Sequence, residues 1–199
     1  MAERKNAVDR AYPGDVVGIY DRGDLVIGDT ITEGEKHTFQ GIPAFSPTIF
    51  KEVLSADPLR TKQLEKGLQQ LTEEGVAQLF IQQPGRRQII GAVGELQFEV
   101  IQYRLSEEYG AACSMKSLPY ARACWFRAET PKAADEFRRY REHQVAEDKK
   151  GRPVYLAESE WMLSSIMRDN PKITFYFTSE MQDEGVTRES LSGIGGRSR

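Results

Sequence analysis

The stretch VAQLFIQQPGRRQIIGAVGELQFEVIQY, residues 76–103, decides the fold class of this chain. Its two short apolar runs, Val76–Gln82 and Gln88–Val93, flank the turn QPGRR at residues 83–87, and this arrangement predicts a β-hairpin. From Glu95 to Tyr109 the apolar residues recur at helical spacing, so a helix is expected directly after the hairpin. Strands followed at once by a helix indicate a mixed α and β architecture.

The residues on both sides complete the pattern. Upstream, Thr38–Ala44 is the predicted first strand, and a helix is expected to begin at Asp57 and Pro58 and to end before Gly75. Asp57 can accept from free backbone N–H groups, and Pro58 loses no hydrogen bond at the first helical position. Downstream, Ala111–Leu118 is the predicted last strand. The order β-α-β-β-α-β predicts an α+β fold with a ferredoxin-like, or split βαβ, unit.

The spacing of apolar residues also predicts which helix faces point inward. Leu68 and Phe98 are expected to lie under the sheet. The full set of predicted inward positions is Leu64, Leu68 and Leu71 in the first helix, and Leu96, Phe98, Val100, Ile101, Tyr103 and Leu105 in the second.

Beyond this unit the elements keep alternating, and we interpret them as an additional α+β extension, not a repeat. The polar stretch at residues 147–153 is predicted to be a solvated loop. The predicted elements are a strand at Ala121–Ala128, a helix at Lys132–His143, a strand at Val154–Ala157, a helix at Ser159–Arg168 and a strand at Ile173–Thr178.

Two short apolar runs near the N-terminus, Asp15–Tyr20 and Leu25–Ile31, are predicted strands. Because a lone hairpin is marginal in water, we expect them to be the last strands of a truncated β-barrel whose earlier strands lie upstream of Met1. The predicted domains are therefore residues 1–36 as an incomplete β-barrel tail, 37–179 as an α+β domain, and 180–199 as a Gly- and Ser-rich disordered tail.

The composition excludes several classes of protein. Lys and Arg number 27 against 30 Asp and Glu, so no bulk charge attracts the chain to nucleic acid, and any RNA contact must come from local patches. Cys113 and Cys124 lack a metal-binding spacing, which favours a reduced cytoplasmic compartment over a disulfide scaffold. No run approaches the roughly 20 apolar residues of a membrane span, so no membrane partner is expected.

The motifs that carry nucleotide chemistry are missing from the sequence. No GxxxxGK[ST] phosphate loop occurs, so this chain is expected to have no catalytic residue, cofactor or metal of its own. Gly91–Leu96 does follow a strand and open a helix, where free N–H groups could hold an anion. Close packing is the preferred interpretation of its glycines, because Glu95 places a negative charge at the same helix end.

The basic clusters are the surface feature for which the sequence suggests a binding partner, since each could neutralise RNA phosphates. Ordinary solubility is the alternative, because acidic residues interleave with most of them. Arg86 and Arg87 are the preferred candidates, as they occupy a hairpin tip and have no acidic neighbour in the sequence. The candidate ribosome- or RNA-binding residues are Arg86, Arg87, Arg138, Arg139, Arg141, Lys149, Lys150 and Arg152.

Five stretches together resemble the class II release factors, a family of bacterial translational GTPases. AYPGDVVG (11–18) and IGDT (27–30) are similar to the closing strands of the second domain of such GTPases, and GAVGELQFEV (91–100) is similar to a motif of their third domain. FQGIPAFSP (39–47) and LEKGLQQLTEEG (64–75) resemble peptide chain release factor three in particular. The combination is far more specific than any single motif.

The resemblance implies the C-terminal part of a GTP-driven ribosomal factor. Such a factor promotes the departure of codon-reading release factors in translation termination. The implied partners are the ribosome and those release factors, in the cytoplasm. GTP and magnesium would belong to the preceding nucleotide-binding domain of the parent protein, so this chain itself is not expected to be an enzyme.

Two other identities remain open. In the first, the chain is a fragment of an elongation factor G-like GTPase, whose third domain has a similar Gly-Glu-Leu motif. Against it, only one further α+β stretch follows Leu118, which leaves no room for two more domains. The other is a stand-alone ferredoxin-like module that binds RNA or a small ligand, for which exposed sheet aromatics would be expected, and Gln88–Val93 has none.

Overall fold

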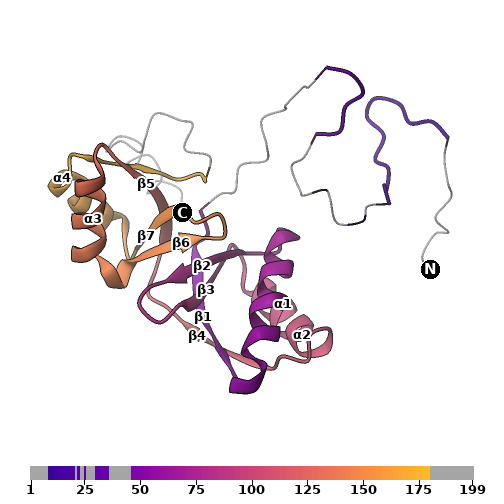
Figure 1. Ribbon diagram of the computed structural model, residues 1–199, viewed down its shortest axis with the longest axis horizontal. Coiled ribbons are helices and arrows are strands. Elements are labelled where there is room, and N and C mark those ends of the chain that lie inside the picture. Colours follow the sequence, from indigo (N-terminus) through magenta and orange to yellow (C-terminus); the bar gives the residue numbers. More distant parts are fainter. Residues whose placement is uncertain (1–8, 21, 23–24, 26–29, 36–45, 180–199) are drawn as a thin grey trace, which may run out of the picture.

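The computed structural model describes residues 9–20, 22, 25, 30–35 and 46–179 (Figure 1). Its folded part is an α+β domain, with α1 and α2 gathered on one side and α3 and α4 on the other. In chain order the elements are β1 (Ile49–Ser55), the 3-10 helix η1 (Pro58–Arg60), α1 (Thr61–Glu73), β2 (Gln78–Gln82), β3 (Arg87–Ala92), α2 (Glu95–Glu107), β4 (Cys113–Ser117), β5 (Arg122–Ala128), α3 (Pro131–Tyr140), the 3-10 helix η2 (Glu142–Gln144), β6 (Val145–Asp148), β7 (Pro153–Ala157), α4 (Glu160–Asp169) and β8 (Ile173–Tyr176).

The first unit, from β1 to β4, has the predicted β-α-β-β-α-β order. Its strands lie side by side in the order β4-β1-β3-β2 and are all antiparallel. The first strand is Ile49–Ser55, whereas the predicted strand Thr38–Ala44 lies outside the described residues. The observed strand begins just after Pro47, because proline has no N–H for a ladder and β-favouring residues follow it.

The second unit, from β5 to β8, repeats the β-α-β-β-α-β order. Its strands lie in the order β6-β7-β5-β8, which is the arrangement of the first unit read from the opposite edge. The prediction of a continuation without a repeat is therefore wrong. The cause is β6, Val145–Asp148, whose polar residues 147 and 148 were assigned to a solvated loop although Asp148 is buried.

Strands β2 and β6 join the two units into one eight-stranded sheet. They pair antiparallel, with Phe80 opposite Asp148 and Gln82 opposite Ala146. In a flat sheet, β4 and β5 would be six strand spacings apart, roughly 29 Å. Only residues 118–121 connect them, and five Cα steps span at most about 18 Å. The sheet must therefore fold over, so that its two halves face each other.

The faces of the half-sheets that carry no helix pack against each other. Phe50 and Phe80 of the first unit share a buried cluster with Trp125 of the second, and the ring centroids of Phe80 and Trp125 lie 6.3 Å apart. Tyr120, in the link between the units, meets Phe50 edge-on at 6.0 Å. We call this cluster the inner core; it consists of Phe50, Phe80, Ile89, Ala123, Trp125, Ala146, Val154, Leu156 and Tyr176.

Two outer cores lie beneath the helix pairs. One includes Leu68 and Phe98, as predicted, and the other includes Phe137 and Phe175, whose ring centroids are 5.8 Å apart. Gly67 lets α1 approach α2, because a Cβ at this position would lie 2.7 Å from Cδ2 of Leu105. The helices are thus fixed to the sheet independently of the inner core.

The inward face of α2 was predicted only in part. Phe98, Ile101 and Leu105 are buried, as expected, but the prediction that Leu96, Val100 and Tyr103 also point inward is wrong. The two triplets lie on nearly opposite sides of the helix, since Leu96 and Phe98, for example, are two residues or about 200° apart, so one sheet cannot cover both. An apolar stripe therefore remains exposed on α2.

Asp15–Tyr20, a predicted strand, is exposed and has no regular secondary structure. A strand needs a partner for its backbone groups, and the described residues provide none here. Most of the second predicted strand, Leu25–Ile31, lies outside the described residues, as does the predicted tail at 180–199. Their assignment to a β-barrel and a disordered tail stays a prediction.

Replacing Leu68 or Phe98 by alanine is expected to lower the free energy of unfolding by about 2–5 kcal/mol. Both side chains are buried, with 0% and 2% of their surface exposed. Urea unfolding followed by circular dichroism measures the change. Leu96→Ala is the matched control, because Leu96 is 73% exposed on the same helix and should lose less than about 0.5 kcal/mol. Equal midpoints for Phe98→Ala and Leu96→Ala would contradict the assigned faces of α2.

Candidate nucleic-acid interface

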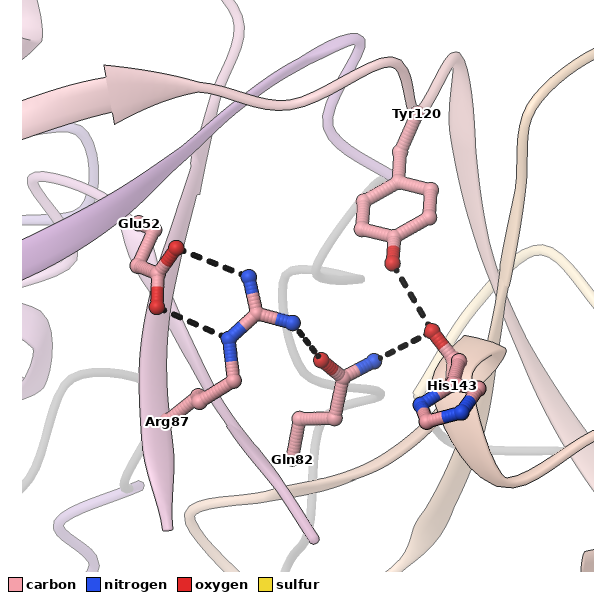
Figure 2. Close-up of polar contacts among 5 residues, drawn as sticks. All are labelled: Glu52, Gln82, Arg87, Tyr120 and His143. Carbon is pink, nitrogen blue, oxygen red and sulfur yellow. Dashed lines mark hydrogen bonds and ion pairs between the residues drawn. The ribbon is translucent and has the colours of Figure 1, made fainter. Parts of the chain in front are cut away.

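The side chains of the neighbouring residues Arg86 and Arg87 have different environments in the structure. Arg86 is exposed in the turn between β2 and β3 and has a φ of 52°. Arg87 begins β3, and its Nε and Nη2 donate to the two carboxylate oxygens of Glu52 at 2.8 and 2.7 Å (Figure 2). The prediction that Arg87 lacks a carboxylate neighbour is wrong, because its partner lies on the neighbouring strand β1, 35 residues away in the sequence.

Arg87 is one member of a chain of polar contacts that we call the inter-unit network. Nη1 of Arg87 donates to Oε1 of Gln82 at 2.7 Å. Nε2 of Gln82 donates to the carbonyl oxygen of His143 at 2.7 Å, and the Tyr120 hydroxyl donates to the same oxygen at 2.9 Å (Figure 2). The network, comprising Glu52, Gln82, Arg87, Tyr120 and His143, therefore connects β1, β2 and β3 to η2 of the second unit.

The ion pair keeps both of its members charged. The hydrogen bonds from Arg87 hold the pKa of Glu52 below its usual value, against the opposing effect of burial. Bonding to Glu52 raises the pKa of Arg87 in turn. The guanidinium of Arg87 is thus committed to the pair with Glu52, although 39% of the side chain stays exposed, and Arg86 is an exposed arginine in the turn before it.

Arg138 and Arg139 lie close to the same turn. Both are exposed near the C-terminal end of α3, and they line a groove together with Gln83. Since Gln83 and Arg86 share one turn, the turn that carries Arg86 lies at the same end of the β2–β6 pair as Arg138 and Arg139. Glu142 and Glu147 line the same groove, so its charge is mixed.

The remaining arginine of α3's end, Arg141, is half-buried where the helix stops.

Arg139 lies over the ring of Tyr140, with 5.3 Å between the guanidinium carbon and the ring centroid. A guanidinium stacked on an aromatic ring keeps its N–H edge available, so Arg139 can still donate to a ligand.

The third basic cluster, Lys149, Lys150 and Arg152, also contains both exposed and ion-paired side chains. Lys149 and Lys150 are exposed in the turn between β6 and β7. Arg152, in contrast, donates from Nε to Oδ2 of Asp148 at 2.7 Å. Asp148 also accepts from the indole of Trp125 at 2.9 Å and from backbone N–H groups of the turn. The predicted solvated loop is therefore a tight turn built on a buried aspartate.

The exposed basic residues occupy two separate places. The turn that carries Arg86 follows the end of β2, whereas the turn that carries Lys149 and Lys150 lies beside the beginning of β2, because Phe80 pairs with Asp148. The two places are separated by the length of β2, roughly 17 Å for five residues.

The alternative anion site at Gly91–Leu96 does not fit a phosphate. Oε1 of Gln97 accepts from the N–H groups of Val93 and Gly94 at 2.9 and 3.0 Å, and thereby occupies the donors that a phosphate would need. A Cβ at Gly91 would collide with Pro47 and Phe80. The geometry thus agrees with the close-packing interpretation, and no nucleotide step is assigned to this helix end.

The described residues offer no arrangement typical of a metal site or a reactive thiol. No group of three or more His, Cys, Asp or Glu among them is placed to hold a metal ion. Cys113 and Cys124 are free and buried, and burial raises the pKa of Cys124 to about 12. Within the same residues, no helix combines the length and apolar character needed to cross a membrane.

Comparison with protein families identifies a match over most of this domain. Residues 39–167 match the model of the class II release factor RF3, C-terminal domain. The match covers well over half of the chain, and the chain therefore belongs to the class II release factor family. It corresponds to the C-terminal region of a translational GTPase that acts in translation termination. The matched residues include both basic turns and α3.

Removal of the Arg87 charge tests the inter-unit network. Arg87→Met is expected to lower the free energy of unfolding at pH 7 by about 1–3 kcal/mol, because the nearly buried Glu52 carboxylate loses its charged partner. The Glu52 pKa is depressed in the folded state, so its stabilising effect is present above the unfolded pKa of about 4.3 and is lost as the pH falls through the folded pKa. Urea unfolding at pH 7, 4 and 3 should show the difference from wild type shrinking below about pH 4.

Arg86→Met is the matched control for this experiment. Arg86 is exposed in the adjacent position, so this variant should follow the wild type at every pH. A difference between wild type and Arg87→Met that stays constant from pH 7 to pH 3 would mean that the pair with Glu52 does not stabilise the fold.

Proposed function

We propose that this region docks on the ribosome and helps its parent factor to promote the GTP-dependent departure of the codon-reading release factors. The observation that carries the proposal is that exposed Arg138 and Arg139 line a groove beside the turn that carries exposed Arg86, at one end of the β2–β6 pair. Membership of the class II release factor family supports the ribosome as the partner and the cytoplasm as the place of action.

The chemistry of these side chains suits RNA backbone. A guanidinium presents a planar fork of donors that matches two phosphate oxygens, and such contacts fix orientation without reading sequence. The net charge of the chain is −3, so the attraction must be local. Arg87 and Arg152 are held in ion pairs, and we therefore assign the contact to the exposed members of the predicted set.

Lys149 and Lys150 would form a second contact. Because they lie roughly 17 Å from the arginine end, along the length of β2, the two contacts would reach different phosphates of a folded RNA. Two contacts on one rigid sheet would define the orientation of the region, and not only its position. That orientation is what a factor driven by nucleotide state has to change.

GTP and magnesium, bound by the nucleotide-binding domain of the parent factor, would supply the hydrolysis. The residues described above would contribute binding and orientation. The inner core and the inter-unit network hold the two units to each other, so a rotation imposed on one unit would move both. We infer that the region acts as a rigid arm and not as two hinged modules.

The two alternative functions have less support. An elongation factor G-like fragment is disfavoured by the family match, which is to class II release factors. A stand-alone module that binds RNA on an open sheet face is disfavoured by the inner core, because the helix-free faces of both half-sheets are buried against each other. Base stacking on such a face would require the domain to open.

Charge reversal at the arginine end tests ribosome binding in the full-length factor. The triple variant Arg86→Glu, Arg138→Glu and Arg139→Glu should weaken binding at least tenfold near physiological salt. If each arginine contacts one phosphate, the log–log salt dependence of the association constant should flatten by roughly 2–3 units. Filter binding at several salt concentrations and constant magnesium measures both quantities.

The triple variant Lys62→Glu, Lys66→Glu and Lys132→Glu is the matched control, because these lysines are exposed on α1 and at the start of α3, away from the arginine end. It should retain a salt slope close to that of the wild type. If the arginine variant kept the wild-type affinity and salt slope, the proposed contact would be contradicted and the solubility interpretation of these residues would be favoured.

The present chain is expected to bind neither GTP nor GDP. The sequence has no phosphate loop, and the helix end at Gly94 is closed by Gln97. Calorimetric titration of the chain with each nucleotide and magnesium measures this. A dissociation constant in the micromolar range would contradict the expectation and would call for a nucleotide site of a different kind.

A further inference from the structure

Strand β4 forms a free edge of the sheet in the described part of the chain. It pairs with β1 on one side, and the strand order ends with it. The backbone hydrogen bonds from Ala56 N–H to Ala112 O at 3.0 Å and from Leu118 N–H to Phe50 O at 2.9 Å define which residues face β1. By alternation, Cys113, Met115 and Ser117 direct their N–H and C=O groups outward.

The outward carbonyl of Cys113 is already used, since Nε2 of Gln102 donates to it at 2.9 Å. The N–H and C=O groups of Met115 and Ser117 remain along the edge, where no strand among the described residues pairs with them. Exposed edges of this kind accept an extended peptide as an additional strand, because its backbone can use the same hydrogen bonds.

A groove between α2 and the start of β4 lies beside this edge. Its α2 side is lined by Glu99, Tyr103 and Glu107, which follow one another at intervals of four residues, and its β4 side by Ala112 and Cys113. Tyr103 is 68% exposed and belongs to the apolar stripe that the sheet leaves uncovered. The groove thus offers an aromatic surface between two carboxylates.

The two carboxylates determine the charge of the occupant. The neighbouring acids Glu95 and Glu108 are paired with Lys51 and Arg104. Among the described contacts, Glu99 and Glu107 have no such partner, so a positively charged ligand would meet two uncompensated charges. An acidic or neutral peptide would gain nothing from them.

Their spacing suits an extended chain. Glu107 lies eight residues after Glu99, a rise of about 12 Å along the helix, and positions i and i+4 of a β-strand are about 13 Å apart. Lysines at alternate positions i, i+2 and i+4 of an added strand would therefore lie opposite Glu99, Tyr103 and Glu107. A lysine over Tyr103 would make a cation–π contact.

We propose that the β4 edge and the adjoining groove of α2 form a docking surface for an extended, lysine-rich segment of a protein. The segment adds as a strand beside β4, and its alternate lysines meet Glu99 and Glu107. On the other face of β4, Lys116 repels a cation, while the partly exposed Leu54 favours an apolar residue. The expected pattern is thus lysine alternating with an apolar residue. This surface is separate from the arginine end and does not depend on RNA binding.

The probe for the experiment is a fluorescein-labelled peptide of five Lys-Val repeats, titrated with the present chain at low salt and followed by fluorescence anisotropy. A peptide of five Glu-Val repeats is its charge control and should not bind. Hydrogen exchange by nuclear magnetic resonance should show that the amides of Met115 and Ser117 become protected when the lysine peptide is bound. Protection there distinguishes strand addition from attraction by charge alone.

Two variants test the two parts of the surface. Glu99→Gln with Glu107→Gln should weaken binding of the lysine peptide about five- to tenfold, while Glu73→Gln with Glu136→Gln, an equal change of charge at exposed positions elsewhere, should not. Ser117→Pro removes one outward N–H at the end of an edge strand, where proline is tolerated, and should weaken binding at least fivefold with an unchanged circular dichroism spectrum.

Absence of binding at millimolar protein, equal binding of the acidic peptide, or wild-type affinity in both test variants would overturn the proposal. Protection confined to amides outside β4 would overturn it as well, because the peptide would then dock elsewhere.

Discussion

The link of residues 118–121 constrains the whole domain. It joins the edge strand β4 to β5, which lies six positions along the same sheet, and it is too short to cross a flat sheet of that width. The sheet must fold over along the β2–β6 pair. Its two helix-free faces then meet, and the apolar side chains on them, Phe80 and Trp125 among them, have to fit one another.

This folding explains the polar contacts as well. Gln82 is buried on the inward face of β2, where its amide N–H would be unsatisfied without the carbonyl oxygen of His143 from the other unit, and Arg87 joins the network by donating to the Gln82 side-chain oxygen. The carbonyl oxygen of His143 and the hydroxyl of Tyr120 complete the network. The turn that presents Arg86 is therefore supported by both units. The proposed docking surface would benefit from such support, because a loosely held turn would lose entropy on binding.

Much of the fold could be predicted from local sequence. The hairpin around residues 83–87, the cap at Asp57 and the buried faces with Leu68 and Phe98 each depend on a few neighbouring residues. The exposed positions of Arg86 and Lys149 follow from turn residues in the same way. Strand β6 could not be predicted, because Asp148 is polar and is buried only through bonds to Trp125 and Arg152. The repeat of the β-α-β-β-α-β order was missed for the same reason.

The sequence by itself determined the α+β class, the helices with the inner face of α1 and part of that of α2, the basic candidates and the resemblance to the class II release factors, because periodicity, turns and motifs act over short distances along the chain. Only the tertiary structure decided that two units share one folded sheet, that Arg87 pairs with Glu52, and that the arginines of α3 lie near the turn of Arg86. These contacts join residues that are many positions apart. Their partners are selected by the register of strands and by the packing of faces, and no local pattern encodes either.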